Sequence, residues 1–183
     1  MGRLPVHTLE SAPAASRPAL ESAKAKFGFI GNLQGHLANS PAAINSYTAM
    51  KAQLAEHAVL SSDVQESIAL SVGGVNDCDY CQSAHTWAGI RAGLTEEQTV
   101  MLRKGSAPWD AKLQALVDLV TEAAENRGEV ADETWDAAVD AGWSATELVE
   151  AGAHLAANLF TNYFNHYAQT ELGRMKPAPG IHP

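Results

Sequence analysis

No stretch of the chain alternates apolar and polar residues for long, and this absence constrains the fold more than any other feature of the sequence. A half-buried β-strand requires such alternation, because successive side chains point to opposite faces of a sheet. Apolar residues recur instead every three or four positions, for example at Ala43, Tyr47, Met50, Leu54 and Ala58. Alanine is very common and β-branched runs are sparse, which also favours helix over strand. The sequence therefore predicts an all-α fold.

Helix start and stop signals divide the chain into about seven or eight predicted helices. Ser40 precedes a proline, which is a typical helix start. Thr95 with Gln98, and Ser144 with Glu147, have the spacing of a capping box. Glycines follow several periodic segments and are typical helix ends. The expected helices cover residues 18–28, 40–58, 61–77, 78–93, a segment from 95, 109–128, 131–142 and 144–172.

The length of 183 residues suits a single domain with short extensions. Residues 1–17 contain Pro5 and Pro13 and show no clear period, so we expect an extended N-terminal arm. Residues 18–173 are the predicted helical domain, and residues 174–183 are a predicted extended tail. Because 46% of the residues are hydrophobic, the domain can build a core without disulfides or metals.

Charge and composition argue against several classes of partner. The formal net charge is -9, and an acidic surface repels both nucleic-acid phosphates and anionic lipids. The sequence has no apolar run of the ~20 residues that a membrane span needs. Its first residues also lack the continuous apolar segment of a secretory signal. We therefore expect a cytoplasmic protein with no nucleic-acid partner and no membrane partner.

Both cysteines of the chain lie in one short stretch, NDCDYCQSAH at residues 76–85. In a reducing compartment such a pair is more often redox-active or metal-binding than structural. Asn76 or Asp77 is the expected cap of the following helix. Cys78 and Cys81 then fall in its first turn, where unpaired backbone N–H groups and the helix dipole favour a thiolate. The spacing of three residues permits a disulfide, so one thiol can attack a substrate and the other can resolve the product.

His85 and Glu66 are candidates for moving the thiol proton. His85 lies four residues after Cys81, about one helical turn, and therefore on the same helix face. An imidazole can take the proton that a thiol loses when it becomes nucleophilic. A histidine used in this way needs an orienting partner. Glu66 is the candidate, because it lies in an otherwise apolar part of the preceding helix.

The cysteine pair is also open to interpretations other than thiol chemistry. The two cysteines could be small core residues, since free cysteine is often buried. They could also bind zinc together with His85 and with Glu66 or a water, although the chain has no second pair of typical ligands. A covalent haem requires a histidine directly after the second cysteine, where this chain has Gln82. A thioredoxin-like site requires a βαβ pattern, which the sequence lacks.

Glu66, the stretch from Cys78 to Cys81, His85 and the following AGIRAGLTEE together resemble the alkylhydroperoxidase D-like branch of the carboxymuconolactone decarboxylase superfamily. In that branch a glutamate lies twelve residues before a CxxC pair and a histidine lies four residues after it, which is the spacing found here. The later stretch NLFTNYFNHYAQTELG is similar to the C-terminal helix of the branch. The resemblance covers roughly residues 30–172 and is specific as a set of residues.

The resemblance implies an all-helical fold, a trimeric or hexameric assembly and a thiol-dependent peroxidase activity. It also implies that the glutamate and the histidine form a proton relay to the cysteines, and that the motif helix lies near subunit contacts. One position departs from the family pattern. The founding hydroperoxidases carry a histidine between the two cysteines, whereas this chain has Tyr80, which cannot act as a base near neutral pH.

We expect the catalytic residues to be Cys81, Cys78, His85 and Glu66, with no cofactor and no metal. Cys81 is the expected attacking thiol and Cys78 the resolving thiol, and the reverse assignment is also open. The expected substrate is a hydroperoxide, and an external dithiol or thioredoxin-like protein would reduce the pair again. Two alternatives remain. One is a non-catalytic redox- or metal-responsive oligomeric module on the same scaffold, and the other is a decarboxylase-like activity of the superfamily.

The remaining histidines and aromatic residues have structural interpretations. Three histidines on helical segments are expected to be structural or surface residues: His36, His57 and His154. His166 could face the active site across an interface, but we expect a satisfied polar residue at a helix contact. Four aromatic residues share one helix face and are expected to pack there, or to form a subunit contact in an oligomer: Phe160, Tyr163, Phe164 and Tyr167. Trp87 either borders the site or anchors the core.

Overall fold

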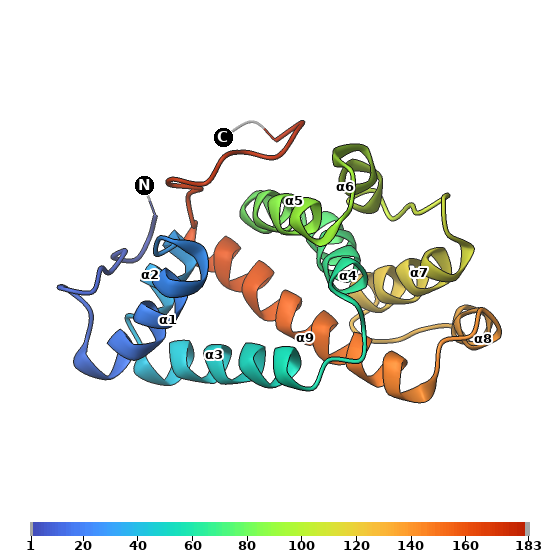
Figure 1. The fold of residues 1–183 in the computed structure, drawn as a ribbon, viewed down its shortest axis with the longest axis horizontal. Coiled ribbons are helices and arrows are strands. Elements are labelled where there is room, and N and C mark those ends of the chain that lie inside the picture. The colour runs from blue at the N-terminus through green and yellow to red at the C-terminus, as the bar shows by residue number, and fades with distance from the viewer. Residues whose placement is uncertain (1, 182–183) are drawn as a thin grey trace.

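The computed structural model describes residues 2–181, and within them it contains helices and no strand (Figure 1). This confirms the all-α prediction. A short 3-10 helix, Ala14–Ser16, precedes nine α-helices in the described part of the chain. These are α1 (Arg17–Phe27), α2 (Asn32–Leu37), α3 (Pro41–Glu56), α4 (Ser62–Val75), α5 (Asp79–Ala92), α6 (Glu96–Leu102), α7 (Ala111–Glu125), α8 (Asp132–Asp140) and α9 (Ala145–Ala168).

The local signals in the sequence fix most of the helix ends. Gly28 ends α1 in the left-handed conformation, with φ of 79°, as a residue without a Cβ can do at no steric cost. The Ser40 side chain accepts a hydrogen bond from the backbone of α3. Complete capping boxes begin α6 at Thr95 and α9 at Ser144, which confirms both predictions.

The short helix α2 was not predicted from the sequence. Its six residues make less than two turns, which is too few for an apolar period to be recognised. Tertiary contacts hold it in place. His36 is buried, and its Nδ1 lies 3.1 Å from the Thr170 hydroxyl. His36 therefore has the structural role that was expected.

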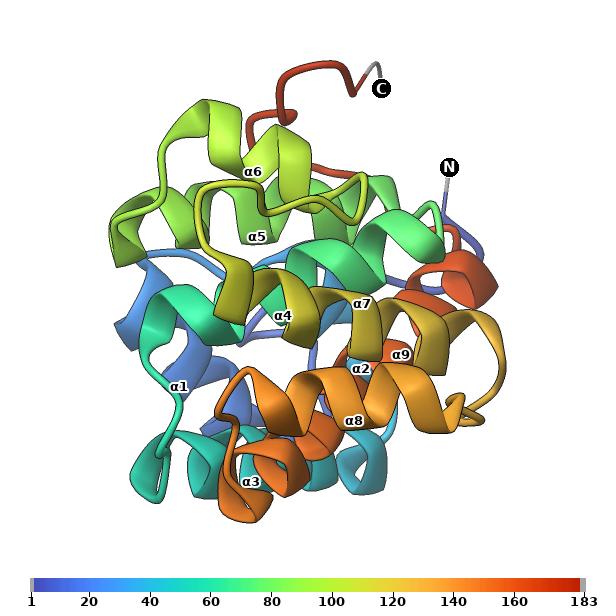
Figure 2. The ribbon, with the colours of Figure 1, turned by 90° about the vertical axis from the view of Figure 1, so that its right-hand side faces the viewer.

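Helix α4 lies at the centre of the fold and packs against α5, α7 and α9 (Figure 2). Ile68, Leu70 and Val72 on α4 are completely buried. One apolar cluster joins α4 to α7, α8 and α9, and a second joins α1, α2 and α3 to the start of α5. Cys78 and Cys81 belong to the second cluster. The cysteine pair therefore lies between the central helices and the N-terminal ones.

Helix α9 is the longest helix and carries two different faces. Its buried face is unusually polar and comprises His154, Asn158, Thr161, Asn162 and Asn165 along with several alanines. Its outer face carries aromatic side chains, described below. Among residues 2–181, no helix combines the length and the apolar character needed to cross a membrane.

The segments that flank the helical domain pack against it. The predicted arm, residues 1–17, contains the 3-10 helix and reaches α1, and the His7 N–H donates to the Gly35 carbonyl at 3.0 Å. The described part of the predicted tail, residues 174–183, runs beside α5 (Figure 1), where the Trp87 indole N–H donates to the Lys176 carbonyl at 2.7 Å. Trp87 thus anchors the tail. Met1, His182 and Pro183, at the ends of these two segments, lie outside the described residues.

Candidate active site

A turn of three residues connects α4 to α5 and positions the cysteines. Asp77 in this turn has a φ of 49°, a left-handed conformation that Asp and Asn tolerate better than most residues. The chain reverses here, and the Cys78 N–H donates to the Gly73 carbonyl at 3.1 Å. The predicted cap, Asn76 or Asp77, is wrong. Cys78 itself is the N-cap of α5, and its Sγ accepts a hydrogen bond from the Cys81 N–H at 3.2 Å.

Asn76 and α9 hold this turn in place. The Asn76 side chain donates to the Val72 carbonyl at 2.8 Å and to the Asn162 side chain at 3.1 Å. Its backbone carbonyl accepts a hydrogen bond from His166 Nε2 at 2.7 Å. His166 is therefore a satisfied polar residue at a helix contact, as expected, and the turn that carries Cys78 is fixed from two sides.

Cys78 and Cys81 form a disulfide in the structure. Their Cα atoms are 5.3 Å apart, within the usual range for a disulfide. Each residue is only 2% exposed. The pair is therefore described in its oxidised form, beneath the surface and at the positive end of α5.

Glu66 and His85 lie together beside the cysteine pair. His85 Nδ1 is 2.7 Å from Glu66 Oε2, and the two side chains are 22% and 23% exposed. Burial by itself raises the pKa of Glu66. The charge of His85 and its hydrogen bond outweigh that effect, with help from Lys51 and Arg91, so that the pKa of this carboxyl lies below its usual value. Glu66 is therefore an anion near neutral pH and orients the imidazole.

The four predicted residues thus form two pairs in adjoining parts of α4 and α5. His85 lies one turn after Cys81 on α5. Within residues 2–181, no hydrogen bond joins His85 to either sulfur in this oxidised form. The structure therefore places a partly exposed carboxylate–imidazole pair next to a buried disulfide.

Asn165 on α9 also belongs to this site and was not predicted from the sequence. Its Nδ2 donates to Cys81 Sγ at 3.2 Å and lies 3.9 Å from Cys78 Sγ. Asn165 is 84 positions from Cys81 in sequence, so only the packing of α9 against α5 brings the two together. The one available signal was the spacing of Asn158, Asn162 and Asn165, which repeats along one face of an otherwise alanine-rich helix.

Residues 41–111 match the Carboxymuconolactone decarboxylase family. This segment includes α3, α4 and α5 and therefore holds Glu66, both cysteines and His85. This segment of the chain is therefore similar to the carboxymuconolactone decarboxylase family. A comparison with curated proteins gives no match.

Solved structures show a similar fold over nearly the whole chain. A peroxidase-related protein with an alkylhydroperoxidase AhpD core, from Ralstonia eutropha JMP134, is similar at 20% identity with a TM-score of 0.84, and the match covers 93% of this chain and 92% of that one. A peroxidase-related protein from Silicibacter sp. TM1040 is 22% identical with a TM-score of 0.79, over 96% and 90% of the two chains. A cysteine-to-alanine variant of the debrominase Bmp8, in complex with 2,3,4-tribromopyrrole, is 13% identical with a TM-score of 0.79, over 92% and 90%. The chain therefore has the alkylhydroperoxidase D-like fold.

Tyr80 lies between the two cysteines, at the position where the resemblance described above implies a histidine. Its side chain is buried, and its hydroxyl accepts a hydrogen bond from the Leu33 N–H at 3.3 Å. Burial raises the pKa of Tyr80, and the hydrogen bond only partly opposes this effect. Tyr80 therefore stays protonated and ties α5 to α2, instead of taking part in proton transfer.

Two further side chains from α3 border the Glu66 carboxylate. Burial raises the pKa of Tyr47 to about 12, with smaller contributions from Tyr80 and Glu66. Burial lowers the pKa of Lys51, and the attraction of Glu66 acts in the opposite direction. The pair of Glu66 and His85 is thus flanked by one neutral phenol and one cation.

The aromatic face of α9 is largely exposed, which differs from the packing role that was expected first. Phe160, Tyr163 and Tyr167 are 42%, 56% and 69% exposed. Phe160 stacks between Tyr47 and Phe164, with ring centroids 5.9 and 6.3 Å apart. These rings form a continuous ladder on the surface that begins at Tyr47, close to the active site. Tyr47 and Phe164 are partly buried against the second apolar cluster, so only part of this face packs as expected.

No group of three or more His, Cys, Asp or Glu side chains within residues 2–181 is arranged to hold a metal ion. The zinc interpretation, built on Cys78, Cys81 and His85, therefore has no preformed set of ligands in this oxidised form. His154, also named from the sequence, is buried and lies 3.6 Å from Glu150 on its own helix. His57 is exposed at the end of α3.

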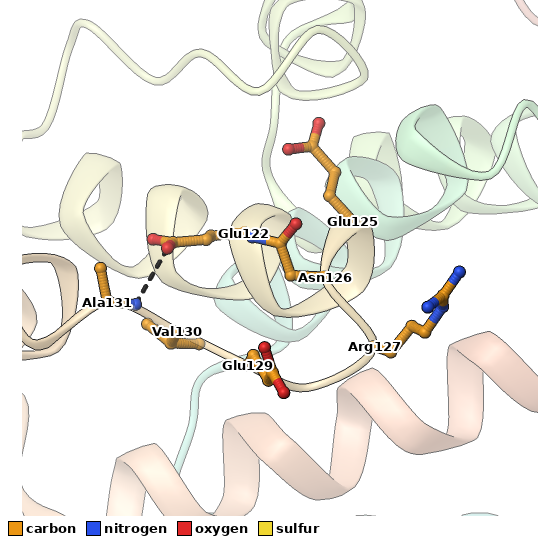
Figure 3. Close-up of a pocket in the computed structure, with 7 residues that line it drawn as sticks. All are labelled: Glu122, Glu125, Asn126, Arg127, Glu129, Val130 and Ala131. Carbon is orange, nitrogen blue, oxygen red and sulfur yellow. Dashed lines mark hydrogen bonds between the residues drawn. The ribbon is translucent and has the colours of Figure 1, made fainter.

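A hollow of the surface lies elsewhere, at the connection between α7 and α8 (Figure 3). Its lining includes Glu122, Glu125 and Glu129, and the Glu122 carboxylate accepts a hydrogen bond from the Ala131 N–H at 2.9 Å. None of the candidate catalytic residues lines this hollow. Solvated carboxylates with no nucleophile are a poor setting for thiol chemistry, so the candidate site remains the one at the start of α5.

Proposed function

We propose that this protein is a thiol-dependent peroxidase that reduces hydroperoxides with Cys81 and Cys78. The observation that carries the proposal is the buried Cys78–Cys81 pair at the N-terminus of α5, with His85, hydrogen-bonded to Glu66, one helical turn after Cys81. A thiolate is favoured at such a helix end, and a carboxylate–imidazole pair is a suitable proton acceptor for the thiol.

The catalytic cycle has three steps whose atoms and electrons balance. The Cys81 thiolate attacks the outer oxygen of ROOH, the O–O bond breaks, and with one proton the products are Cys81 sulfenic acid and ROH. The Cys78 sulfur then attacks the sulfenic sulfur, so the S–S bond forms and water leaves. An external dithiol finally reduces this disulfide by two thiol–disulfide exchanges and becomes a disulfide itself.

His85 carries the proton in this scheme. Its Nδ1 donates to the Glu66 carboxylate, which leaves Nε2 of the neutral ring as an acceptor. Nε2 receives the proton of the Cys81 thiol, and the imidazolium that forms is stabilised by the Glu66 charge. The same proton then goes to the RO⁻ leaving group when the O–O bond breaks.

Reductive dehalogenation is a second candidate function, because the debrominase Bmp8 shares the fold with a TM-score of 0.79. The balance would be R–Br plus two thiols giving R–H, HBr and the same Cys78–Cys81 disulfide. This reaction uses the same pair of thiols but a different oxidant, so the two functions are separable by substrate.

The direct test treats the reduced protein with one equivalent of an organic hydroperoxide and, in parallel, with one equivalent of 2,3,4-tribromopyrrole. A peroxidase yields a peptide that has lost two hydrogens across Cys78 and Cys81 in the first arm, with ROH released. Bromide release in the second arm alone would support the dehalogenase. A stable sulfinic acid on one cysteine, with the other thiol free, would contradict a resolving pair.

A further inference from the structure

Asn165 is a buried polar residue whose contacts with the disulfide do not account for its presence in the core. The residue is 4% exposed, and its Nδ2 donates to the sulfurs of the disulfide at 3.2 and 3.9 Å. Its Oδ1 is buried and has no hydrogen-bond partner among residues 2–181. A buried amide with an unpaired acceptor destabilises a fold compared with an apolar side chain of the same shape. The benefit of Asn165 must therefore lie outside the oxidised, folded state.

Reduction of the disulfide strengthens the hydrogen bond from Asn165 Nδ2 to a cysteine sulfur when that sulfur becomes a thiolate. A disulfide sulfur is a weak hydrogen-bond acceptor, whereas a thiolate carries a full negative charge and accepts strongly. A donor at hydrogen-bond distance favours the charged form of the group that it touches. Nδ2 lies 0.7 Å nearer to Cys81 than to Cys78, the difference between 3.9 and 3.2 Å, so its effect on the two sulfurs is unequal.

The backbone of α5, in contrast, stabilises a thiolate at Cys78. As the N-cap of α5, Cys78 Sγ accepts the Cys81 N–H at 3.2 Å, and this donor is present whatever side chain occupies position 165. Without Asn165, the N-terminus of the helix would therefore support a Cys78 thiolate at least as well as a Cys81 thiolate.

We propose that Asn165 stabilises the thiolate of Cys81 in preference to that of Cys78 and so selects Cys81 as the attacking thiol. The role of Cys81 as attacking thiol rests on the proposed peroxidase function. The preferential stabilisation does not, because it is a property of the reduced protein alone.

The experiment measures the pH midpoint of thiolate formation by ultraviolet absorbance in two single-cysteine backgrounds, Cys78→Ser and Cys81→Ser. Asn165→Ala in the Cys78→Ser background should raise the midpoint of Cys81 by about one pH unit, which is a tenfold lower thiolate fraction on the acid side. The same change in the Cys81→Ser background should raise the midpoint of Cys78 by clearly less.

Asn158→Ala is the matched control, because Asn158 is equally buried on α9 but its side chain donates to the His154 carbonyl of its own helix. It should leave both midpoints unchanged. Asn165→Asp retains the shape of the side chain and serves if the alanine variant does not fold. Its carboxylate should raise the Cys81 midpoint further than alanine does.

Equal shifts for both cysteines, or no shift for Cys81, would overturn the inference. Peroxide turnover is measured separately on the chain with both cysteines. A selective shift in a protein that does not consume peroxide would refute the proposed function and support the thiolate assignment. Peroxide turnover without a shift of the Cys81 midpoint would support the proposed function and refute the thiolate assignment.

Discussion

We expect Glu66 and His85 to determine how readily the reactive thiol ionises. Glu66→Gln preserves the shape of the side chain but removes the negative charge that attracts the imidazolium formed when His85 takes the thiol proton. We expect the thiol pKa, which should lie below the free value of about 8.5 in wild type, to rise by about one unit. His85→Gln should have the same effect, and the double variant should be barely worse than either single one, because the pair acts as a unit.

The measurement is the rate of iodoacetamide alkylation against pH for the reduced proteins. Glu150→Gln is a useful control, since it removes a carboxylate from the vicinity of another histidine, His154, on α9. Its curve should coincide with that of wild type. Superimposable curves for wild type, Glu66→Gln and His85→Gln would eliminate the relay.

The lowered pKa of Glu66 also has a consequence for acid stability. A glutamate in the unfolded chain titrates near 4.5, and His85 keeps the folded value lower despite burial. Glu66 therefore contributes stability that is fully present above about pH 4.5 and is lost as the pH falls through the folded pKa. The Tm of wild type relative to Glu66→Gln should decrease across that acid interval. A difference in Tm that is constant with pH would contradict the shift.

At the scale of single residues, the sequence was informative where chemistry has a fixed local spacing. Cys78, Cys81 and His85 share one helix, so their intervals alone indicate a site. Asn165 could not be found in this way, because its approach to the sulfurs depends on how α9 packs against α5. The cap of α5 was mispredicted because Asp77 takes up a left-handed turn, which moves the helix start to Cys78.

The packing of α4 against the end of α6 depends on a residue without a side chain. A Cβ added at Gly74 would overlap the Arg103 carbonyl oxygen, a backbone atom that cannot move aside alone. Gly74→Ala should therefore destabilise the protein by about 1–3 kcal/mol, as overpacking generally does. The displaced segment leads directly to Cys78, so the reduced thiols should also become more accessible to alkylation.

Gly152→Ala is the matched control, because a Cβ at this exposed position of α9 meets no atom within 4 Å. Removing a helical glycine there should stabilise the protein by about 0.5–1 kcal/mol. Urea unfolding of the two variants measures both effects. Equal stabilities for Gly74→Ala and wild type would show that α4 and α6 are not in the close contact described.

At the scale of elements, the capping chemistry was predictable, and short elements held by tertiary contacts were not. Thr95 and Ser144 begin helices because each side chain satisfies backbone donors locally. Helix α2 has no comparable signal in its six residues, and its place is set by contacts such as that of His36 with Thr170.

For the whole molecule, the aromatic ladder on α9 predicts self-association. Tyr163 and Tyr167 are among the most exposed large hydrophobic side chains of the described residues, and Tyr167 ends a stack of rings that starts at Tyr47 near the site. We expect a stable homo-oligomer, a trimer or a hexamer, with this face at a subunit contact. Light scattering at micromolar concentrations measures the mass.

Tyr163→Asp should shift the assembly towards monomer by placing a charge in the contact. Val139→Asp, at a similarly exposed apolar position on α8, should leave the mass unchanged. A monomeric wild-type protein, or two variants that dissociate alike, would contradict this assignment of the aromatic face.

The all-α class followed from the apolar period alone. The sequence did not predict which helix faces are exposed to solvent, because exposure depends on how α3, α5 and α9 pack together.

Peroxide turnover shows directly whether Cys81 and Cys78 reduce hydroperoxides. Purified protein is given an organic hydroperoxide together with a panel of dithiol donors, including a thioredoxin-like protein, and consumption of peroxide is followed for wild type, Cys81→Ser and Cys78→Ser. We predict continuous turnover by wild type with at least one donor. Turnover should fall by about 100-fold or more in both serine variants, as expected when a nucleophile or its resolving partner is removed. Peroxide consumption that is equal in wild type and Cys81→Ser, or absent in wild type with every donor, would contradict this prediction.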